Sequence, residues 1–288
     1  MIGKAGCRGA ATIVNAIATG KGAAFGITLE TDAIVRIEAG EGDVKLLDSS
    51  EGADLVPRCV KALAARAGRA GVTGEVSVRS EIPISRGLKS SSAVSNAVVL
   101  ATARALEANL SDFELILTGI EESIKAGVTI TGAFDDASAC FMGGVVATDN
   151  KTFTLMHRGV IDPDLVVLLH VPNRKITKAS VKNLDFSKIK NEVEKAFNLA
   201  LRGEYLKAME VNSRAYSKVL DVSEDIADLA RRKGALAAGI SGTGPATTVI
   251  CERGEDSQIE RALQNEEGSI LRAHVNDTPA TEVVPRLL

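Results

Sequence analysis

The hydrophobic and polar positions of the chain alternate between strand-like and helix-like periods. Residues 75–82 (EVSVRSEI) place Val76 and Val78 on one side of the backbone, which is the two-residue period of a strand. Residues 94–108 are rich in helix formers with a broad apolar face, which predicts a helix over 91–108. The first half has further predicted elements of both kinds: strands at 33–38, 44–47 and 145–148, and helices at 54–67 and 112–126.

The second half starts a new series of elements at Leu165, after a turn at residues 149–151. The predicted elements are strands at 165–171, 235–240, 246–251 and 270–276, and helices at 187–202, 204–220, 223–233 and 256–266. An order of strand, helices, two strands, helix and strand fits an α+β sandwich of the ferredoxin type. By itself, the pattern supports a mixed α and β protein built in two layers.

Composition and charge narrow the range of partners. The 288 residues suffice for two modest domains or one large domain, and 45% of them are hydrophobic, so a core can form without disulfides. Aromatic residues make up 3% of the chain and Trp is absent, which leaves little for stacking on nucleic-acid bases. The net charge of −3 also argues against nucleic acid or an anionic membrane as a partner.

The cysteines and the first residues indicate the compartment. The four Cys lie far apart, with no CxxC spacing, which fits buried thiols in a reducing cytosol. The three His are equally scattered, so neither a His-based metal site nor a hydrolase triad is expected. The first residues lack the apolar core of a signal peptide, and no run approaches 18 apolar residues. We expect a cytoplasmic protein without a membrane segment.

The segment between the strand at 75–82 and the following helix shows the clearest sign of chemistry. It reads PISRGLKSSSA (residues 83–93), with three consecutive Ser at the helix entrance. A helix N-terminus has free N–H groups and a positive dipole end, so it attracts phosphate. Gly87 lets the backbone approach a ligand, and the Ser hydroxyls add donors or reach a metal ion. An ordinary Ser N-cap is the alternative, but three Ser behind Gly-Leu-Lys favour a phosphate loop.

Two common nucleotide motifs are absent. The nearest match to a Walker A loop, residues 15–22 (NAIATGKG), lacks the first Gly and the hydroxyl residue after the Lys. The Gly pairs at 20 and 22 and at 242 and 244 are not followed by the third Gly of a GxGxxG motif. A Rossmann dinucleotide site is therefore unsupported.

Three motifs together resemble those of the GHMP kinase superfamily, which includes galactokinases, homoserine kinases and mevalonate kinases. The pattern Pro83-x-x-x-Gly87-Leu88-x-Ser90-Ser91-x-Ala93 resembles its second, ATP-binding motif. Residues 237–250 (AAGISGTGPATTVI) resemble its third motif, and residues 132–144 (GAFDDASACFMGG) its catalytic-aspartate segment. The spellings RGLKSSSA and SGTGPA, and the run from Val14 to Ile27, are similar to those of archaeal shikimate kinases.

This resemblance implies a fold, a reaction and cofactors. The fold is α+β, with a ribosomal S5 domain 2-like N-terminal domain at 1–155 and a ferredoxin-like C-terminal domain at 156–288. The reaction is transfer of the ATP γ-phosphoryl group to the 3-hydroxyl of shikimate, with Mg²⁺, in aromatic amino-acid synthesis. Homoserine or mevalonate kinase activity is the alternative, and the resemblance allows a homodimer. A non-enzymatic binding protein with this fold would be marked by a damaged phosphate loop or a missing aspartate. A decarboxylase of the same superfamily would keep the aspartate, so that residue alone does not define the reaction.

The resemblance also assigns candidate residues. The ATP contacts are Pro83, Ser85, Arg86, Gly87, Leu88, Lys89, Ser90, Ser91, Ser92 and Ala93. Lys89 stands where most of the superfamily has Gly, so it either contacts a phosphate or points to solvent.

For catalysis, Asp135 is the first choice to orient and deprotonate the acceptor hydroxyl, and Asp136 is the alternative; a plain helix N-cap would also explain an Asp pair. Lys4, in the place of the lysine of the first motif, would assist the aspartate or the phosphate. For Mg²⁺, the resemblance selects Ser91 and Glu122, with Glu121 as competitor. The candidate substrate contacts are Lys21, Arg174, Gly242, Thr243 and Gly244. Lys175 is a further candidate for the shikimate carboxylate.

Overall fold

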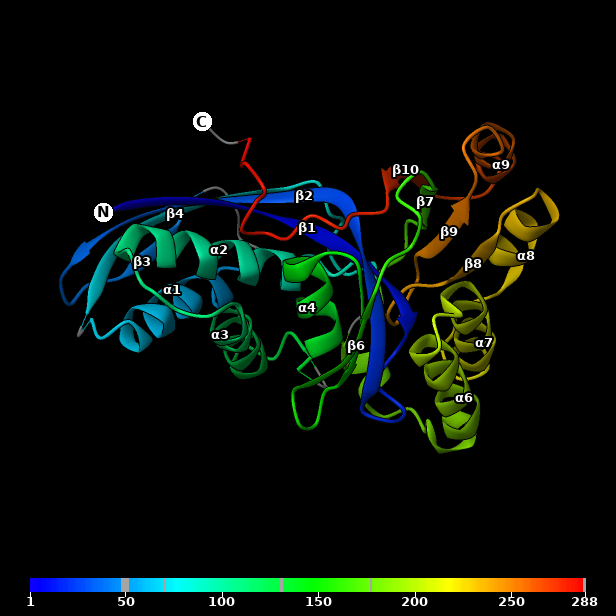
Figure 1. Cartoon of the computed structure of the whole chain (residues 1–288), viewed down its shortest axis with the longest axis horizontal. Coiled ribbons are helices and arrows are strands. Elements are labelled where there is room, and N and C mark those ends of the chain that lie inside the picture. The colour runs from blue at the N-terminus through cyan, green and yellow to red at the C-terminus, as the bar shows by residue number, and fades with distance from the viewer. Residues whose placement is uncertain (48–51, 70, 130–131, 177, 287–288) are drawn as a thin grey trace.

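The computed structural model describes residues 1–47, 52–69, 71–129, 132–176 and 178–286, and these form two sheets with helices packed on them (Figure 1). The strands of the first sheet are β1 (Ile2–Val14), β2 (Lys21–Ala39), β3 (Val44–Leu46), β4 (Val72–Ser80), β5 (Val145–Asp149) and β6 (Thr154–Gly159). Their order is β3-β4-β2-β5-β6, with β1 paired to β2. The pairs are antiparallel except β3 with β4.

Four helices cover one face of this sheet (Figure 1). They are α1 (Leu55–Arg66), α2 (Ser90–Leu106), α3 (Asp112–Lys125) and α4 (Phe134–Met142). Small residues in β1 allow α2 to pack very close to the sheet: a Cβ on Gly3 would lie 1.9 Å from the carbonyl oxygen of Ala101. α2 is buried almost all round, because α1, α3 and α4 surround it.

The second sheet contains β7 (Val166–Val171), β8 (Ala237–Ile240), β9 (Thr247–Cys251) and β10 (Ser269–His274). Its order is β10-β7-β9-β8 and every pair is antiparallel. Counted along the chain, this order is 4-1-3-2, so the expected ferredoxin-like arrangement is confirmed. The accompanying helical segments are α5 (Lys178–Lys182), η1 (Ser187–Ile189), α6 (Lys190–Leu201), α7 (Tyr205–Ser217), α8 (Asp225–Arg232) and α9 (Asp256–Leu263).

The two sheets share packing rather than standing apart. One hydrophobic core extends from the first sheet through α6 and α7 to one side of the second sheet, and a smaller core lies under α8 and α9. The expected domain division after residue 155 falls inside β6, which pairs with β5 of the first sheet. After β10, residues 275–286 run back along the first sheet (Figure 1), where the amide of Ala280 donates to the carbonyl oxygen of Phe141 on α4 and Val283 packs on Gly6.

No helix within the described ranges is long and apolar enough to cross a membrane.

Candidate active site

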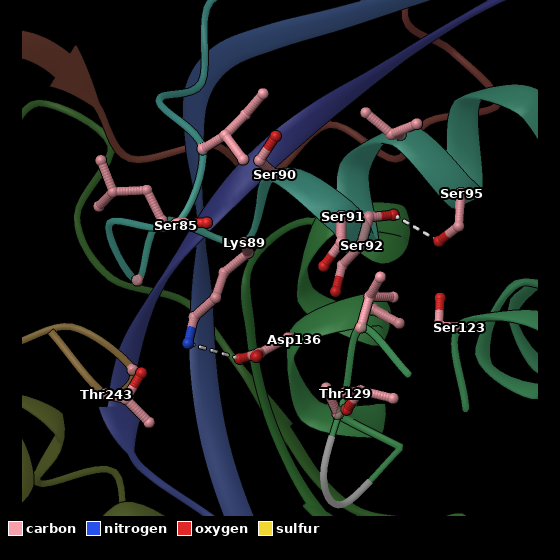
Figure 2. A pocket seen from close by; sticks show the side chains of 18 of the residues that line it. Ser85, Lys89, Ser90, Ser91, Ser92, Ser95, Ser123, Thr129, Asp136 and Thr243 are labelled. Atoms are coloured by element: carbon pink, nitrogen blue, oxygen red, sulfur yellow. Dashed lines mark hydrogen bonds and ion pairs between the residues drawn. The ribbon is translucent and has the colours of Figure 1, made fainter. Parts of the chain in front are cut away.

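A cavity of about 360 Å³ lies where three loops meet, and its size is typical of small-ligand sites. The three segments are the loop between β4 and α2, the residues before and at the start of α4, and the loop between β8 and β9. Figure 2 shows side chains from all three directed into this space. The predicted residues that line it are Pro83, Ser85, Gly87, Leu88, Lys89, Ser90, Ser91, Ser92, Asp135, Asp136, Gly242, Thr243 and Gly244.

The Ser loop leads directly into the first turn of α2. Lys89 is the N-cap residue and has a left-handed backbone, with φ of 65°. A lysine side chain has no acceptor, so it cannot cap the amide groups of the first turn. Those N–H groups and the hydroxyls of Ser90, Ser91 and Ser92 form a set of donors suited to a phosphate.

The loop before α2 interlocks with the loop between β8 and β9. The Ser241 hydroxyl donates to the carbonyl oxygen of Gly87 at 2.9 Å. The backbone amide of Ala246 donates to the carbonyl oxygen of Arg86 at 3.1 Å. Gly87 has φ of +85°, and a Cβ there would lie 2.0 Å from the carbonyl oxygen of Ser241. Glycine is therefore required at position 87, and the contact fixes the second sheet against the phosphate loop.

Two residues of the first hairpin hold the third motif, and our sequence analysis missed both. The amide of Gly242 donates to the Thr12 hydroxyl at 2.7 Å, and Asn15 Nδ2 donates to the carbonyl oxygen of Gly242 at 2.7 Å. Asn15 is itself fixed, because its backbone N–H donates to the side-chain oxygen Oδ1 of Asn212 on α7 at 2.9 Å. No local motif marks these residues, since their partners are about 200 positions away in the chain.

Lys89 points inward rather than to solvent. Its Nζ lies 3.0 Å from Oδ1 of Asp136, and the side chains of Lys89 and Asp136 are only 7% and 16% exposed. Figure 2 shows this ion pair at the centre of the cavity, with Thr243 beside it. Nζ also lies over Gly242, where a Cβ would be 2.9 Å away. The cavity thus holds a positive charge next to a pair of acids.

Asp135 lies at the start of α4 and is 4% exposed. Its Oδ1 accepts a hydrogen bond from Asn150 Nδ2 at 2.8 Å. Burial, followed by the neighbouring Asp136 carboxylate, raises the pKa of Asp135 to about 7, against the opposing effects of Lys89 and Asn150. A carboxyl group with such a pKa can take a proton from a substrate at neutral pH.

The structure does not bring two of the predicted lysines to the cavity. Lys4 lies near the opposite end of β1 from Thr12, with an exposed side chain, and its carbonyl oxygen accepts from Arg104. Lys21 starts β2, and its Nζ lies 5.9 Å from the centre of the Phe197 ring on α6. Adjacent strand residues face opposite sides, and Gly22 faces Asp135, so Lys21 points away from it. These two expectations are therefore corrected.

Two predicted arginines also have other partners. Arg86 donates to the backbone carbonyl oxygens of Asn173, at 2.7 Å, and Arg174. Arg174 pairs in turn with Asp221, at 2.9 Å. Neither side chain is among those that line the cavity, so Arg86 supports the loop rather than reaching a phosphate. Ala93 is fully buried in the core under the loop, and it too does not line the cavity.

Glu122 is misplaced for the role that the sequence predicted. It is 4% exposed and its carboxylate pairs with Lys125 at 2.6 Å, while the lining residues of α3 are Ile120 and Ser123. Its competitor Glu121 pairs with Arg66 at the surface. The described residues contain no group of three or more His, Cys, Asp or Glu side chains that could hold a metal ion. The Ser91 and Ser92 hydroxyls remain as oxygen donors for a cation that arrives with phosphates.

Comparison with known families defines the class of the protein. The model of the GHMP kinases N terminal domain matches residues 54–144, and the model of the GHMP kinases C terminal domain matches residues 193–270. These segments contain the phosphate loop, both acids and the third motif. The protein is a GHMP kinase.

Curated relatives narrow the assignment. The chain is 43% identical over 248 residues to the shikimate kinase of Pyrococcus furiosus, covering 85% of this chain and 90% of the relative. It is 38% identical over 283 residues to the shikimate kinase of Methanothrix thermoacetophila, covering 97% and 96%. The chain therefore belongs to the shikimate kinase family of archaeal type within the GHMP kinases.

Solved structures agree on the fold. The homoserine kinase of Cytophaga hutchinsonii has a TM-score of 0.76 at 17% identity, with 96% of each chain covered. The mevalonate kinase of Methanococcus jannaschii has a TM-score of 0.72 at 17% identity, covering 96% of this chain and 98% of that one. The predicted two-sheet GHMP kinase fold is thus confirmed.

Proposed function

We propose that this protein transfers the γ-phosphoryl group of ATP to the 3-hydroxyl of shikimate. The observation that carries the proposal is that a buried carboxyl group with a pKa of about 7, Asp135, shares one cavity with the Ser loop. Identity of 38% to 43% to curated shikimate kinases over most of the chain supports shikimate as the acceptor.

In this proposal, the start of α2 binds the phosphates of ATP. The amide groups of its first turn and the hydroxyls of Ser90 to Ser92 donate to phosphate oxygens. Lys89 is held in the cavity by Asp136, so its ammonium group is already desolvated and placed next to the transferring group. Such preorganised charge stabilises a phosphoryl-transfer transition state with little reorganisation.

Asp135 supplies the base. Its carboxylate accepts the proton of the acceptor hydroxyl while the oxygen attacks the γ-phosphorus, and the bond to the ADP oxygen breaks. The carboxyl pKa of about 7 is close to neutral pH, where the ionised form and its basicity are both substantial.

Mg²⁺ is proposed to accompany ATP. The donor set fits this ion: Ser91 and Ser92 offer hydroxyl oxygens at the phosphate end of the cavity, and Mg²⁺ needs few protein ligands when phosphates supply the others. When bound, the ion neutralises charge on the phosphate oxygens.

A coupled assay of ADP release tests the proposal. Purified protein is incubated with ATP and Mg²⁺ and, in separate reactions, shikimate, homoserine or mevalonate. We expect ADP release that depends on shikimate. Release with homoserine or mevalonate but not with shikimate would overturn the assigned acceptor.

A further inference from the structure

Asn150 forms hydrogen bonds to both the side chain and the backbone of the proposed base. Its Nδ2 donates to Oδ1 of Asp135 at 2.8 Å, and its Oδ1 accepts from the backbone amide of Asp135 at 3.2 Å and from the Thr148 hydroxyl at 2.7 Å. Asn150 is 3% exposed, and Thr148 and Asp135 are equally buried. The amide group therefore contacts both the side chain and the backbone of the residue on which the reaction depends.

The orientation of this amide follows from its partners. A backbone N–H can only donate, so the atom of Asn150 that meets the amide of Asp135 must be the oxygen. The NH₂ group then has to face the Asp135 carboxylate. A reversed side chain would set an N–H against an N–H and an oxygen against a carboxylate, so this environment selects one state.

The chain around Asn150 is held from two sides. Residue 150 follows the last residue of β5, and its amide donates to the carbonyl oxygen of Gly20 in the β1–β2 turn at 2.8 Å. Gly22 lies on the other side of the carboxylate. A side chain at position 22 would occupy the space of the carboxylate, because its Cβ would lie 2.2 Å from Oδ2 of Asp135. The carboxyl group is thus fixed between an amide donor and a glycine.

We propose that Asn150 is a positioning residue of the reaction, which fixes the plane of the Asp135 carboxylate and favours its ionised form through one obligatory N–H donor. This role rests on the proposed function of Asp135 as the base. It concerns the geometry of the base and is independent of which acceptor binds. Nothing in the local sequence marks Asn150, because it looks like an ordinary turn residue between β5 and β6.

The charged and titratable groups around Asp135 come from several elements. Asp136 and Cys140 lie on its own helix, Lys89 approaches from the start of α2, and Tyr216 faces it from α7. Lys89 and the Asn150 amide favour the ionised carboxylate, whereas Asp136 and burial oppose it. Asn150 does not titrate, so its donor can be replaced by an acceptor of similar size in an Asp variant while these groups stay in place.

The test is Asn150→Asp, which replaces the NH₂ donor by an oxygen of similar size and places a second carboxyl group against that of Asp135. The amide of Asp135 and the Thr148 hydroxyl still donate to Oδ1 of residue 150 and favour its ionised form. The carboxyl group at position 150 therefore ionises first, and Asp135 keeps its proton to higher pH. We expect the acid limb of the kcat profile to move up by about one pH unit or more, while the KM for ATP changes less than about threefold. Asn150→Ala should also lower kcat, since it removes the donor.

Asn276→Asp is the matched control. Asn276 is 1% exposed, its Nδ2 donates to the carbonyl oxygen of Thr278 and its Oδ1 accepts from Arg8, so the change removes a donor and adds a buried carboxyl group at a site where Arg8 can pair with it. Asn276 does not line the cavity, and we expect its variant to leave the acid limb in place. Thr148→Val is a second control: it removes one donor to Asn150 but leaves the amide of Asp135 to orient it.

A measurement without turnover keeps this inference separate from the proposed function. ¹³C NMR of the aspartate carboxyl groups, with Asp135 assigned from Asp135→Asn, follows the titration of that residue directly. We expect the Asp135 midpoint to rise in Asn150→Asp and to stay unchanged in Asn276→Asp. An unchanged midpoint in Asn150→Asp, or equal shifts in both variants, would overturn the role of Asn150. A shifted midpoint in a protein that does not phosphorylate shikimate would leave this role standing and refute only the proposed function.

Discussion

Gly22 lies directly against the carboxylate of Asp135. A Cβ at position 22 would be 2.2 Å from Oδ2 and 2.6 Å from Cγ of Asp135, and 3.0 Å from Ala16. Real Cβ atoms do not approach so closely, so either the carboxyl group or the strand must move when residue 22 gains a side chain. The first residues of β2 are thus part of the wall that places the base.

Gly22→Ala is therefore expected to lower kcat by about 10²-fold through displacement of the base, because an error of about 1 Å at a reacting group has this effect. ATP binding, measured by calorimetry, should change little, since the Ser loop is not touched. Gly40→Ala is the control, because its added Cβ would meet only the Thr73 side chain, at 3.1 Å. Equal loss of activity in both variants would contradict the proposed contact.

Lys89→Met should lower kcat by about 10²- to 10³-fold, since it removes a preorganised charge from the cavity and leaves Asp136 without its partner. It should also move the acid limb of activity upward, because Lys89 lowers the pKa of Asp135. Lys125→Met breaks another ion pair with a buried carboxylate, that of Glu122, away from the cavity. Steady-state kinetics should show near-normal kcat in that control, and a near-normal kcat in Lys89→Met would refute the role of the ammonium group.

Asp135→Asn should abolish most turnover and yet stabilise the fold at neutral and alkaline pH. In the folded protein the pKa of Asp135 rises from 3.8 to about 7, so the unfolded chain ionises first and stability falls as pH rises between these values. Asparagine carries no charge, so above pH 7 the free energy of unfolding of the variant should exceed that of the wild type by on the order of a few kcal/mol. Thermal unfolding of the variant and the wild type at pH 5 and pH 8 measures this difference in stability. The variant should be stabilised more at pH 8 than at pH 5, and a larger stabilisation at pH 5 would contradict the raised pKa.

Periodic elements of the fold were predictable because burial of one face repeats in the sequence. The strand around Val76, the helix that follows the Ser loop and the helix expected at 112–126 all reflect local rules, although boundaries differ by a few residues. β1 and the first half of β2 were not predicted as strands. They are rich in Gly and Ala, which have low strand propensity, and their small size serves the close approach of α2 and Asp135.

The candidate site was predictable where a motif is contiguous and not where it depends on distant contacts. Residues 83–92 and 242–244 were predicted correctly as two parts of the cavity lining, because each loop carries its chemistry within a few residues. Lys4 and Lys21 were assigned from their places in segments that resemble family motifs, and Glu122 from its spacing, but the structure places their side chains elsewhere. Asn150 carried no sequence signal, since its role appears only when β5 meets α4.

The central claim is tested most directly by identifying the product. Purified protein is incubated with ATP, Mg²⁺ and shikimate, and the mixture is analysed by mass spectrometry and ³¹P NMR, with Asp135→Asn in parallel. The account predicts equimolar ADP and a phosphate monoester on the 3-hydroxyl of shikimate, with a loss of several orders of magnitude in the variant. Absence of phosphorylated shikimate from the wild-type reaction, or undiminished formation of it by Asp135→Asn, would contradict the account.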